Sequence, residues 1–212
     1  MRELNPGRVH IYGKDAGKDV SVAPPSPYLE IPDDVLVERA FGFLDLCGFS
    51  EFTVQAGPPA AFEALRQFRS LVRLVAAARG VRIASWLGDG AMLVGVHAGA
   101  VASAVVEIVS RSKHPARGSV TQGQALLFEG DDHIGGCVNL ASRLCSAADP
   151  EQVLTVGSIL GTLPDWIENN LVGSMALRGL GDEVVYNLGI VDEIADEMKF
   201  GFPSGSVPVV KV

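Results

Sequence analysis

The sequence predicts an α+β domain made of one antiparallel sheet with helices packed against it. Apolar runs of strand and helix length alternate as strand, helix, strand, strand, helix, strand, followed by further short elements. A hairpin signal, Gly88-Asp89-Gly90, joins two of the strand-like runs. The chain has 212 residues, long enough to bury a full core. This order is that of a ferredoxin-like βαββαβ sandwich with extra C-terminal elements.

Both ends of the chain differ in composition from the middle. Residues 1–37 are rich in Gly, Pro, Asp and Lys, and we expect an extended arm with one short strand over 9–12. Residues 191–212 contain Pro203 and Pro208 and are expected to form a tail. The sequence therefore predicts a folded domain over residues 38–190.

The first half of this domain contains three predicted strands and one long helix. An apolar run over 39–44 indicates a buried strand with Asp45 at its end. A helix is predicted over 60–79, because its apolar residues recur at helical spacing and prolines precede it at the first turn. Two strand-like runs, 81–86 and 91–94, flank the hairpin signal.

The second half continues with shorter elements. A helix is predicted first, before Lys113-His114-Pro115, and a closing hairpin is predicted last, around Gly179-Leu180-Gly181-Asp182. In chain order the expected helices cover 97–112, 137–148, 158–163 and 165–170, and the expected strands cover 118–121, 124–128, 153–156, 175–177 and 184–188.

Bulk composition narrows the function classes. A net charge of −8 argues against nucleic acid or an anionic membrane surface as the main partner. The apolar stretch 91–110 contains Gly95, His97, Gly99 and Glu107, so it is interpreted as a strand end plus a helix and not as a membrane span. Three cysteines without C-x-x-C spacing, and no signal-peptide pattern, predict reduced thiols in a cytoplasmic protein.

Two aspartates are candidate metal ligands. Asp45 lies at a strand end and Asp89 in the turn of a hairpin, and two such positions can meet at one edge of a sheet. Carboxylate oxygens suit Mg²⁺ or Mn²⁺, which leave coordination positions for water and substrate phosphates. Taken alone, Asp89 is better explained as a turn residue, and Asp45 is equally explained as a cap of the following turn.

A second candidate group lies on the helix predicted over 137–148. Asn139 and Arg143 are four residues apart and therefore share one helix face. An arginine there could stabilise charge on a transferring phosphoryl group, and the asparagine could orient ribose or phosphate. A surface arginine and a helix-start asparagine would explain the same pair in isolation.

Three stretches in this order and spacing resemble the catalytic domain of class III nucleotidyl cyclases. Residues 43–50, Phe-Leu-Asp-Leu-Cys-Gly-Phe-Ser, resemble the first metal motif, and Leu87-Gly88-Asp89-Gly90 resembles the second. The separation of 44 residues between Asp45 and Asp89 is similar to that in the family. Residues 135–144, which include Asn139 and Arg143, resemble the helix that stabilises the transition state. The resemblance covers residues 37–190.

The resemblance implies a reaction and a division of roles. Members of the family convert ATP or GTP to the 3′,5′-cyclic monophosphate and pyrophosphate with two Mg²⁺ or Mn²⁺ ions per site. It implies that the metals are held by Asp45, Asp89 and the Leu46 carbonyl, and that Asn139 and Arg143 are catalytic. It also implies a head-to-tail homodimer in which the metal residues and the Asn–Arg pair of one site come from different subunits.

The resemblance further implies which residues contact the substrate, namely Gly48, Phe49, Ser85 and Asp132. Asp132 matches the adenine-reading acidic position, which favours ATP over GTP. Ser85 stands where adenylyl cyclases of the family have a lysine, so base preference stays open at this point. The segment 124–131 is also shorter than is common in the family.

Two other functions remain open from the sequence. One is a cyclase-like domain with weak or no activity that binds nucleotide or a partner protein. The other is a different phosphoryl-transfer enzyme built on a similar sheet, although no acceptor or nucleophile motif supports it.

Overall fold

The computed structural model describes residues 35–128 and 132–192. The chain divides into two units, residues 1–35 and 36–212, and the described residues fall almost entirely in the second. The strand expected over 9–12, nearly all of the expected arm and most of the expected tail lie outside the described residues. The boundaries after residues 37 and 190 therefore stay predictions.

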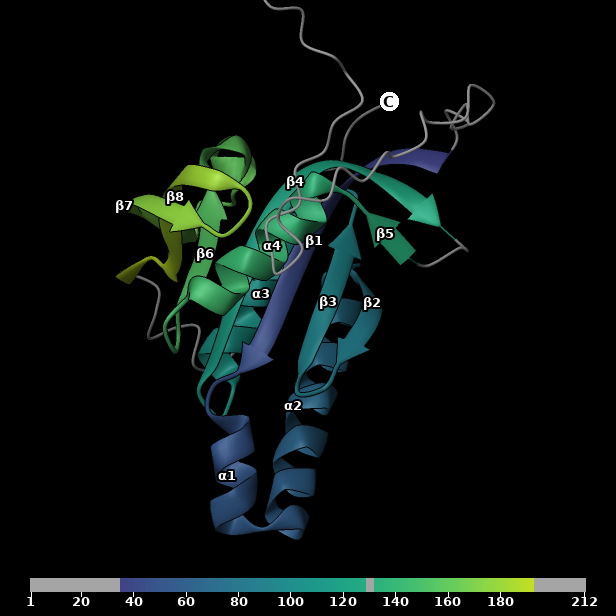
Figure 1. Ribbon diagram of the computed structural model, residues 1–212, viewed down its shortest axis with the longest axis vertical. Coiled ribbons are helices and arrows are strands. Elements are labelled where there is room, and N and C mark those ends of the chain that lie inside the picture. Colours follow the sequence, from purple (N-terminus) through teal and green to yellow (C-terminus); the bar gives the residue numbers. More distant parts are fainter. Residues whose placement is uncertain (1–34, 129–131, 193–212) are drawn as a thin grey trace, which may run out of the picture. The chain divides into compact units, whose positions relative to one another are not determined.

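The α+β prediction is confirmed, and Figure 1 shows the strands and helices in their order along the chain. The first part of the chain runs strand, helix pair, strand, strand, helix, strand, as the ferredoxin-like order requires. The elements are β1 (Leu36–Leu46), α1 (Phe49–Ala56), α2 (Pro58–Ala78), β2 (Arg82–Leu87), β3 (Gly90–Gly95), α3 (Ala98–Arg111), β4 (Ala116–Phe128), β5 (Asp132–Ile134), α4 (Gly136–Ala147), β6 (Val153–Val156), the 3₁₀ helix η2 (Gly157–Thr162), β7 (Ile167–Leu177) and β8 (Gly181–Ile190).

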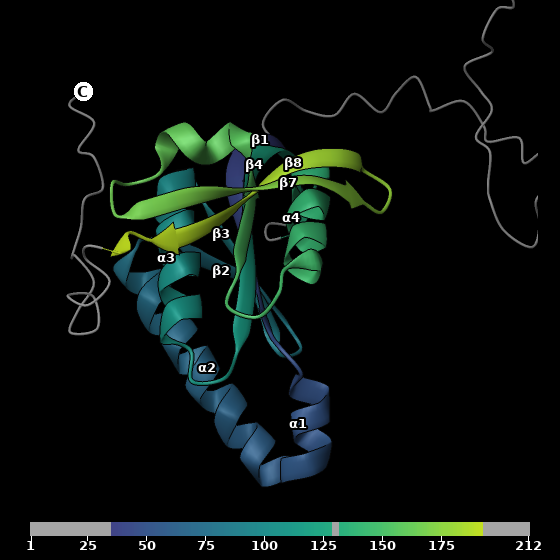
Figure 2. The ribbon, with the colours of Figure 1, turned by 90° about the vertical axis from the view of Figure 1, so that its left-hand side faces the viewer.

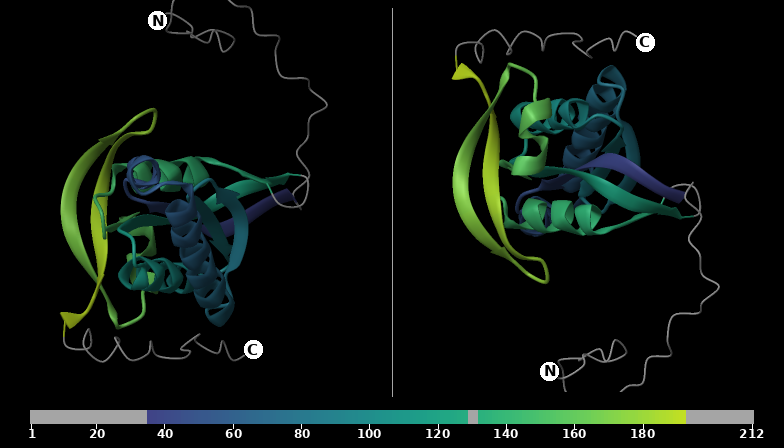
Figure 3. Two further views of the ribbon diagram at one scale, coloured as in Figure 1. Left: turned by 90° about the horizontal axis from the view of Figure 1, so that it is seen from below. Right: turned by 90° about the horizontal axis from the view of Figure 1, so that it is seen from above.

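The strands form one mixed sheet in the order β2-β3-β1-β4-β6-β8-β7, with β5 paired to β4. The first four strands pair antiparallel, so β1 lies in the middle between β3 and β4. The β4–β6 pair is parallel, and β8 and β7 extend the sheet as an antiparallel ribbon. Figure 3 shows this ribbon along one edge of the layered structure.

Helices cover both faces of the central strands. Side chains of β1 alternate between the two faces, because successive residues of a strand point in opposite directions. Ala40, Leu44 and Leu46 pack with residues of α2 and α3, whereas Phe41 and Phe43 pack with residues of α4. Figure 2 shows α2 and α3 on one side of the sheet and α4 on the other. Alternation places Asp45 on the α4 face, with Phe41 and Phe43.

The structure differs from the predicted elements at three places. Helix α1 was not expected; it has 8 residues and none of them is buried, so its apolar pattern is too short for periodicity to identify it. The strands expected over 118–121 and 124–128 are one strand, β4. The helix expected over 165–170 is instead the start of β7, whose residues pair with β8 from Ile167 onward.

The helices of the described ranges include none with the length and hydropathy of a membrane span. The apolar stretch 91–110 divides into β3 and α3, as predicted. Helix α3 is almost entirely enclosed, which explains its apolar composition without a membrane.

Candidate active site

The carboxylate of Asp45 lies near the end of β1 and is bound by an arginine. Arg117, at the start of β4, faces it because Asp45 and Arg117 are partners in the β1–β4 ladder. Arg117 Nη2 donates to Asp45 Oδ2 at 2.8 Å and Arg117 Nε donates to the same oxygen at 3.1 Å. The Asp45 side chain is 32% exposed, so its second oxygen remains open to further ligands.

Asp89 occupies a tight turn beside this position. The predicted β2–β3 hairpin is confirmed, and its two turn residues are Gly88 and Asp89, because Leu87 pairs with Gly90. Gly88 has φ +64, and a glycine with positive φ at the first turn position is typical of a type II′ hairpin. The local sequence thus places Asp89, and not Gly90, at the tip.

Close packing presses this hairpin against β1. A Cβ atom at Gly90 would lie 2.4 Å from the carbonyl oxygen of Leu44, so only glycine fits there. Leu44 pairs with Ala91, and the next residue of β1 is Asp45. The two aspartates that the sequence selected are therefore brought to the same end of the sheet.

Electrostatics at this end favour a bound cation. Burial raises the pKa of Asp89, and the negative charge of Asp45 raises it further, while a hydrogen bond from the backbone of Asp89 itself and the charge of Arg117 act in the opposite direction. Two carboxylates that repel each other and still have open oxygens fit a divalent ion with oxygen ligands. Within residues 35–128 and 132–192, no three His, Cys, Asp or Glu side chains gather as a metal cluster. A metal here would need water or substrate oxygens as additional ligands.

The residues after Asp45 form a short backbone turn into α1. Leu46 is 2% exposed and pairs with Ala116 in the ladder. Gly48 has φ +67 and precedes α1, with no atom within 4 Å of the place its Cβ would occupy. Phe49 then begins the helix, so the free N–H groups of the first turn of α1 follow Asp45 closely in the chain. Helix N-termini of this kind suit phosphate oxygens.

Arg117 is a site residue that sequence reasoning missed. Besides binding Asp45, its Nη1 donates to the carbonyl oxygens of Ser146 and Ala148 at 3.0 and 3.1 Å. It therefore joins the metal-ligand candidate to the C-terminal end of α4. Arg117 stands alone among small residues in the sequence, and only the β1–β4 register reveals its partner.

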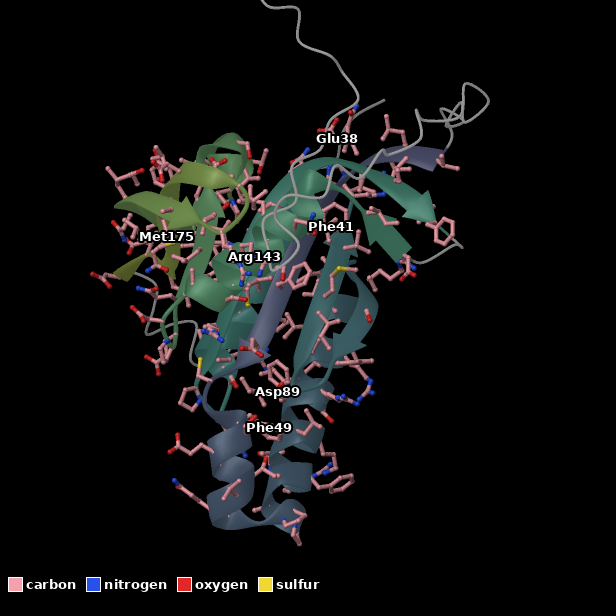
Figure 4. The ribbon with its side chains drawn as sticks, viewed as in Figure 1. Glu38, Phe41, Phe49, Asp89, Arg143 and Met175 are labelled. Carbon is pink, nitrogen blue, oxygen red and sulfur yellow. The ribbon has the colours of Figure 1, made fainter. Side chains whose placement is uncertain are left out.

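Asn139 and Arg143 share the exposed face of α4, as their spacing predicted. The opposite face, with Ala141, Leu144 and Cys145, is buried against the sheet and the C-terminal strands. Neither side chain takes part in a hydrogen bond or ion pair in the part of the chain that the structure describes. Figure 4 shows Arg143 well separated from Asp89. One chain therefore does not bring the two predicted halves of the site together.

Ser85 and Asp132 lie on different strands. Ser85 is half-buried on β2 opposite Met92, just after a bulge in the β2–β3 ladder. Asp132 is exposed at the start of β5 opposite Phe128. His133, beside it, packs edge-on against Phe41, with ring centroids 5.3 Å apart. Ser85 is therefore partly accessible and Asp132 is accessible.

Curated proteins of related sequence include adenylate cyclases. An uncharacterized protein of Mycobacterium tuberculosis is 33% identical over 138 residues, which is 61% of this chain and 35% of that protein. An adenylate cyclase of Glutamicibacter nicotianae is 28% identical over 187 residues, 85% of this chain and 44% of that enzyme. The chain spans less than half the length of these relatives. No family model matches the sequence.

Solved structures of similar fold are cyclase catalytic domains. The adenylyl cyclase CyaB of P. aeruginosa superposes with a TM-score of 0.63 at 20% identity, covering 74% of this chain and 95% of that one. The guanylate cyclase domain of RhGC from Catenaria anguillulae, in complex with GTP, gives a TM-score of 0.64 at 16% identity, covering 72% and 96%. The resemblance that the three motifs indicated is confirmed, and the chain has the fold of class III cyclase catalytic domains.

Proposed function

We propose that this chain, which has the fold of a class III nucleotidyl cyclase catalytic domain, converts ATP to 3′,5′-cyclic AMP and pyrophosphate. The observation that carries the proposal is the convergence of Asp45 and Asp89 beside the N-terminus of α1. Two carboxylates next to free backbone N–H groups suit a triphosphate with its divalent ions.

The proposed reaction is an in-line displacement at the α-phosphorus. The ribose 3′-oxygen forms a bond to that phosphorus, the bond to the pyrophosphate oxygen breaks, and the 3′-hydroxyl proton passes to solvent. Bound Mg²⁺ or Mn²⁺, two per site, would supply Lewis-acid stabilisation of the attacking and leaving oxygens. Asp45, Asp89 and the Leu46 carbonyl would hold these ions, and the backbone at Gly48 and Phe49 would bind phosphate oxygens.

Arg143 and Asn139 complete the site from a second copy of the chain. In one chain, Arg143 lies apart from Asp89 (Figure 4). The side chains of Arg143 and Asn139 are both exposed. A two-fold dimer brings this α4 face against the metal end of its partner and creates two equivalent sites. Arg143 then stabilises charge on the phosphorus, and Asn139 positions the ribose.

Base choice falls to Asp132 and Ser85. An exposed carboxylate such as Asp132 can accept a hydrogen bond from the exocyclic amine of adenine, whereas guanine presents a carbonyl oxygen at that position of the ring. The Ser85 hydroxyl can donate to a ring nitrogen. This pair favours ATP as the substrate and GTP as the weaker one.

The test is a cyclisation assay with ATP and GTP in the presence of Mn²⁺, using the wild-type chain, Asp45→Ala and Arg143→Ala. Each variant alone is expected to lose about 10²–10³-fold in turnover, as when one preorganised electrostatic contact is removed. A 1:1 mixture should regain about a quarter of wild-type activity, because half of the dimers are mixed and each mixed dimer has one intact site.

The result also separates the alternatives. Arg143→Ala with near wild-type turnover, or a mixture no more active than its components, would exclude the shared site. No product from either nucleotide with the wild-type chain at high protein concentration would instead favour a non-catalytic, nucleotide-binding or protein-binding module.

A further inference from the structure

A side chain of α2 binds the hairpin that carries Asp89. Arg69 Nη2 donates to the carbonyl oxygen of Gly88 at 2.9 Å, across 19 residues of sequence. Its guanidinium also lies over the ring of Trp86, 4.8 Å from the centroid. Arg69 therefore contacts one residue in β2 and one in the turn.

The guanidinium of Arg69 is partly buried, which is energetically costly. The Nε atom of Arg69 is buried and donates no hydrogen bond in the described ranges. No carboxylate pairs with Arg69 among those residues either. Burying part of a guanidinium without an acid partner is unfavourable. The hydrogen bond to the Gly88 carbonyl and the packing over the Trp86 ring offset this cost.

The hairpin tip is fixed from two sides. Gly90 is pressed against the Leu44 carbonyl of β1, where a Cβ would lie 2.4 Å from the oxygen. Gly88 is held by Arg69 of α2. Asp89 lies between these two anchors, so the direction of its carboxylate depends on both. Without Arg69, the turn would lose its hydrogen bond to α2 and keep the packing of Gly90 against β1.

Arg69 binds the backbone of the turn next to Asp89. Its Nη2 donates to the carbonyl oxygen of Gly88, the residue before Asp89. The contact therefore acts on the position of the turn that carries the carboxylate.

We propose that Arg69 is a positioning residue that fixes Asp89 relative to Asp45 and so sets the affinity of the site for divalent metal. This inference rests on the proposed function, since it assigns metal binding to the two aspartates. Residues that orient metal ligands typically change metal affinity by about 10–100-fold when they are removed.

The chain offers a matched control. Arg73, one helical turn after Arg69, lies over the same Trp86 ring at 5.0 Å. It is exposed, and the structure describes no hydrogen bond between it and the hairpin. Arg73→Met removes a cation from Trp86 without touching the Gly88 carbonyl, and Arg69→Met removes both interactions. Methionine keeps length and helix propensity in each case.

The experiment measures Mn²⁺ binding directly and as the Mn²⁺ concentration for half-maximal cyclisation at saturating ATP. The full chain is used as wild type, Arg69→Met, Arg69→Lys and Arg73→Met, with thermal unfolding measured for each. Arg69→Met should weaken Mn²⁺ binding by about tenfold or more, and Arg69→Lys should recover part of the loss because lysine can still donate to the carbonyl. Arg73→Met should bind Mn²⁺ like the wild type.

The possible failures are distinguishable. Unchanged Mn²⁺ affinity in Arg69→Met, or an equal loss in Arg73→Met, would overturn the positioning role. If Arg69→Met does not fold, a folded Arg69→Lys that binds Mn²⁺ more weakly than both the wild type and Arg73→Met would support the positioning role, and an Arg69→Lys that binds Mn²⁺ as tightly as Arg73→Met would contradict it. If Mn²⁺ binds through Asp45 but no cyclic product forms, the proposed cyclase activity is rejected. Mn²⁺ binding by the Arg69 variants then still decides the positioning role. A wild-type chain that binds no Mn²⁺ with ATP present would overturn both.

Discussion

Arg117 binds Asp45 through two nitrogens on a single carboxylate oxygen, Oδ2, at 2.8 and 3.1 Å. The two residues are 72 positions apart in the chain and meet as ladder partners of β4 and β1. The guanidinium compensates one of the two negative charges at the end of the sheet. A divalent ion placed between Asp45 and Asp89 would share Asp45 with this arginine.

Replacing Arg117 with glutamine should make the metal-free protein less stable and more dependent on metal. The change removes the Asp45 ion pair and the bonds to the Ser146 and Ala148 carbonyls, and we expect a loss of about 1–3 kcal/mol. Mn²⁺ should restore more stability to this variant than to the wild type, because it supplies the missing positive charge. Urea denaturation with and without Mn²⁺ measures both effects. Arg66→Gln, which breaks an exposed pair, is the control, and equal Mn²⁺ shifts in all proteins would contradict the prediction.

Replacing Gly90 with alanine should disrupt the hairpin. The added Cβ would meet the Leu44 carbonyl oxygen at 2.4 Å, and neither backbone can move without breaking the β1–β3 ladder. We expect a loss of stability of about 2–3 kcal/mol, the size of an overpacking defect, together with loss of metal binding. Gly136→Ala, where no atom lies within 4 Å of the new Cβ, should be neutral or slightly stabilising in the same thermal-unfolding experiment. A Gly90→Ala protein as stable as Gly136→Ala would show that the close contact is absent.

Removing the charge of Glu107 should strongly destabilise the helical layer. Glu107 is 6% exposed and accepts hydrogen bonds from Arg79 at 2.9 and 3.0 Å, and Arg111 binds its other oxygen. Glu107→Gln leaves two arginines without the buried carboxylate, which should cost about 3 kcal/mol in the free energy of unfolding. The measurement is chemical denaturation, with Glu63→Gln in the exposed Arg66 pair as control. Equal effects of the two substitutions would mean that burial does not strengthen the Glu107 network.

Cys145 should resist alkylation in the folded chain. Burial raises the pKa of its thiol to about 12, with the nearby Asp45 charge acting in the same direction. Because the thiolate is the reactive form, labelling at pH 8 should require unfolding. Because the pKa is raised on folding, the buried thiol contributes its full stability below the ordinary value of 9.0, and this contribution is lost progressively as the pH rises from 9.0 through about 12.

Mass spectrometry after iodoacetamide treatment, with and without urea, tests this. Labelling of Cys145 in the native chain as fast as in urea would contradict the burial seen here. Cys145→Ala identifies the labelled peptide and serves as the control.

The sequence alone determined the elements and motifs that depend on neighbouring residues. The helices α2, α3 and α4 and the β2–β3 hairpin were predicted because apolar periodicity and turn chemistry are local properties. The motifs that contain Asp45, Asp89, Asn139 and Arg143 are also short local patterns, and their resemblance to those of class III cyclases indicated the fold. Short segments without such a pattern were predicted wrongly. Residues 165–170, for example, were expected to form a helix, but β7 begins there.

Only the tertiary structure decided which distant residues meet. Residues 167–170 form a strand because they pair with β8, and this pairing outweighs any helical preference of the local sequence. Arg117 reaches Asp45 through the β1–β4 register, and Arg69 reaches Gly88 because α2 packs beside the hairpin. Such contacts arise from the packing of the whole domain, and a single sequence does not encode them in any short pattern.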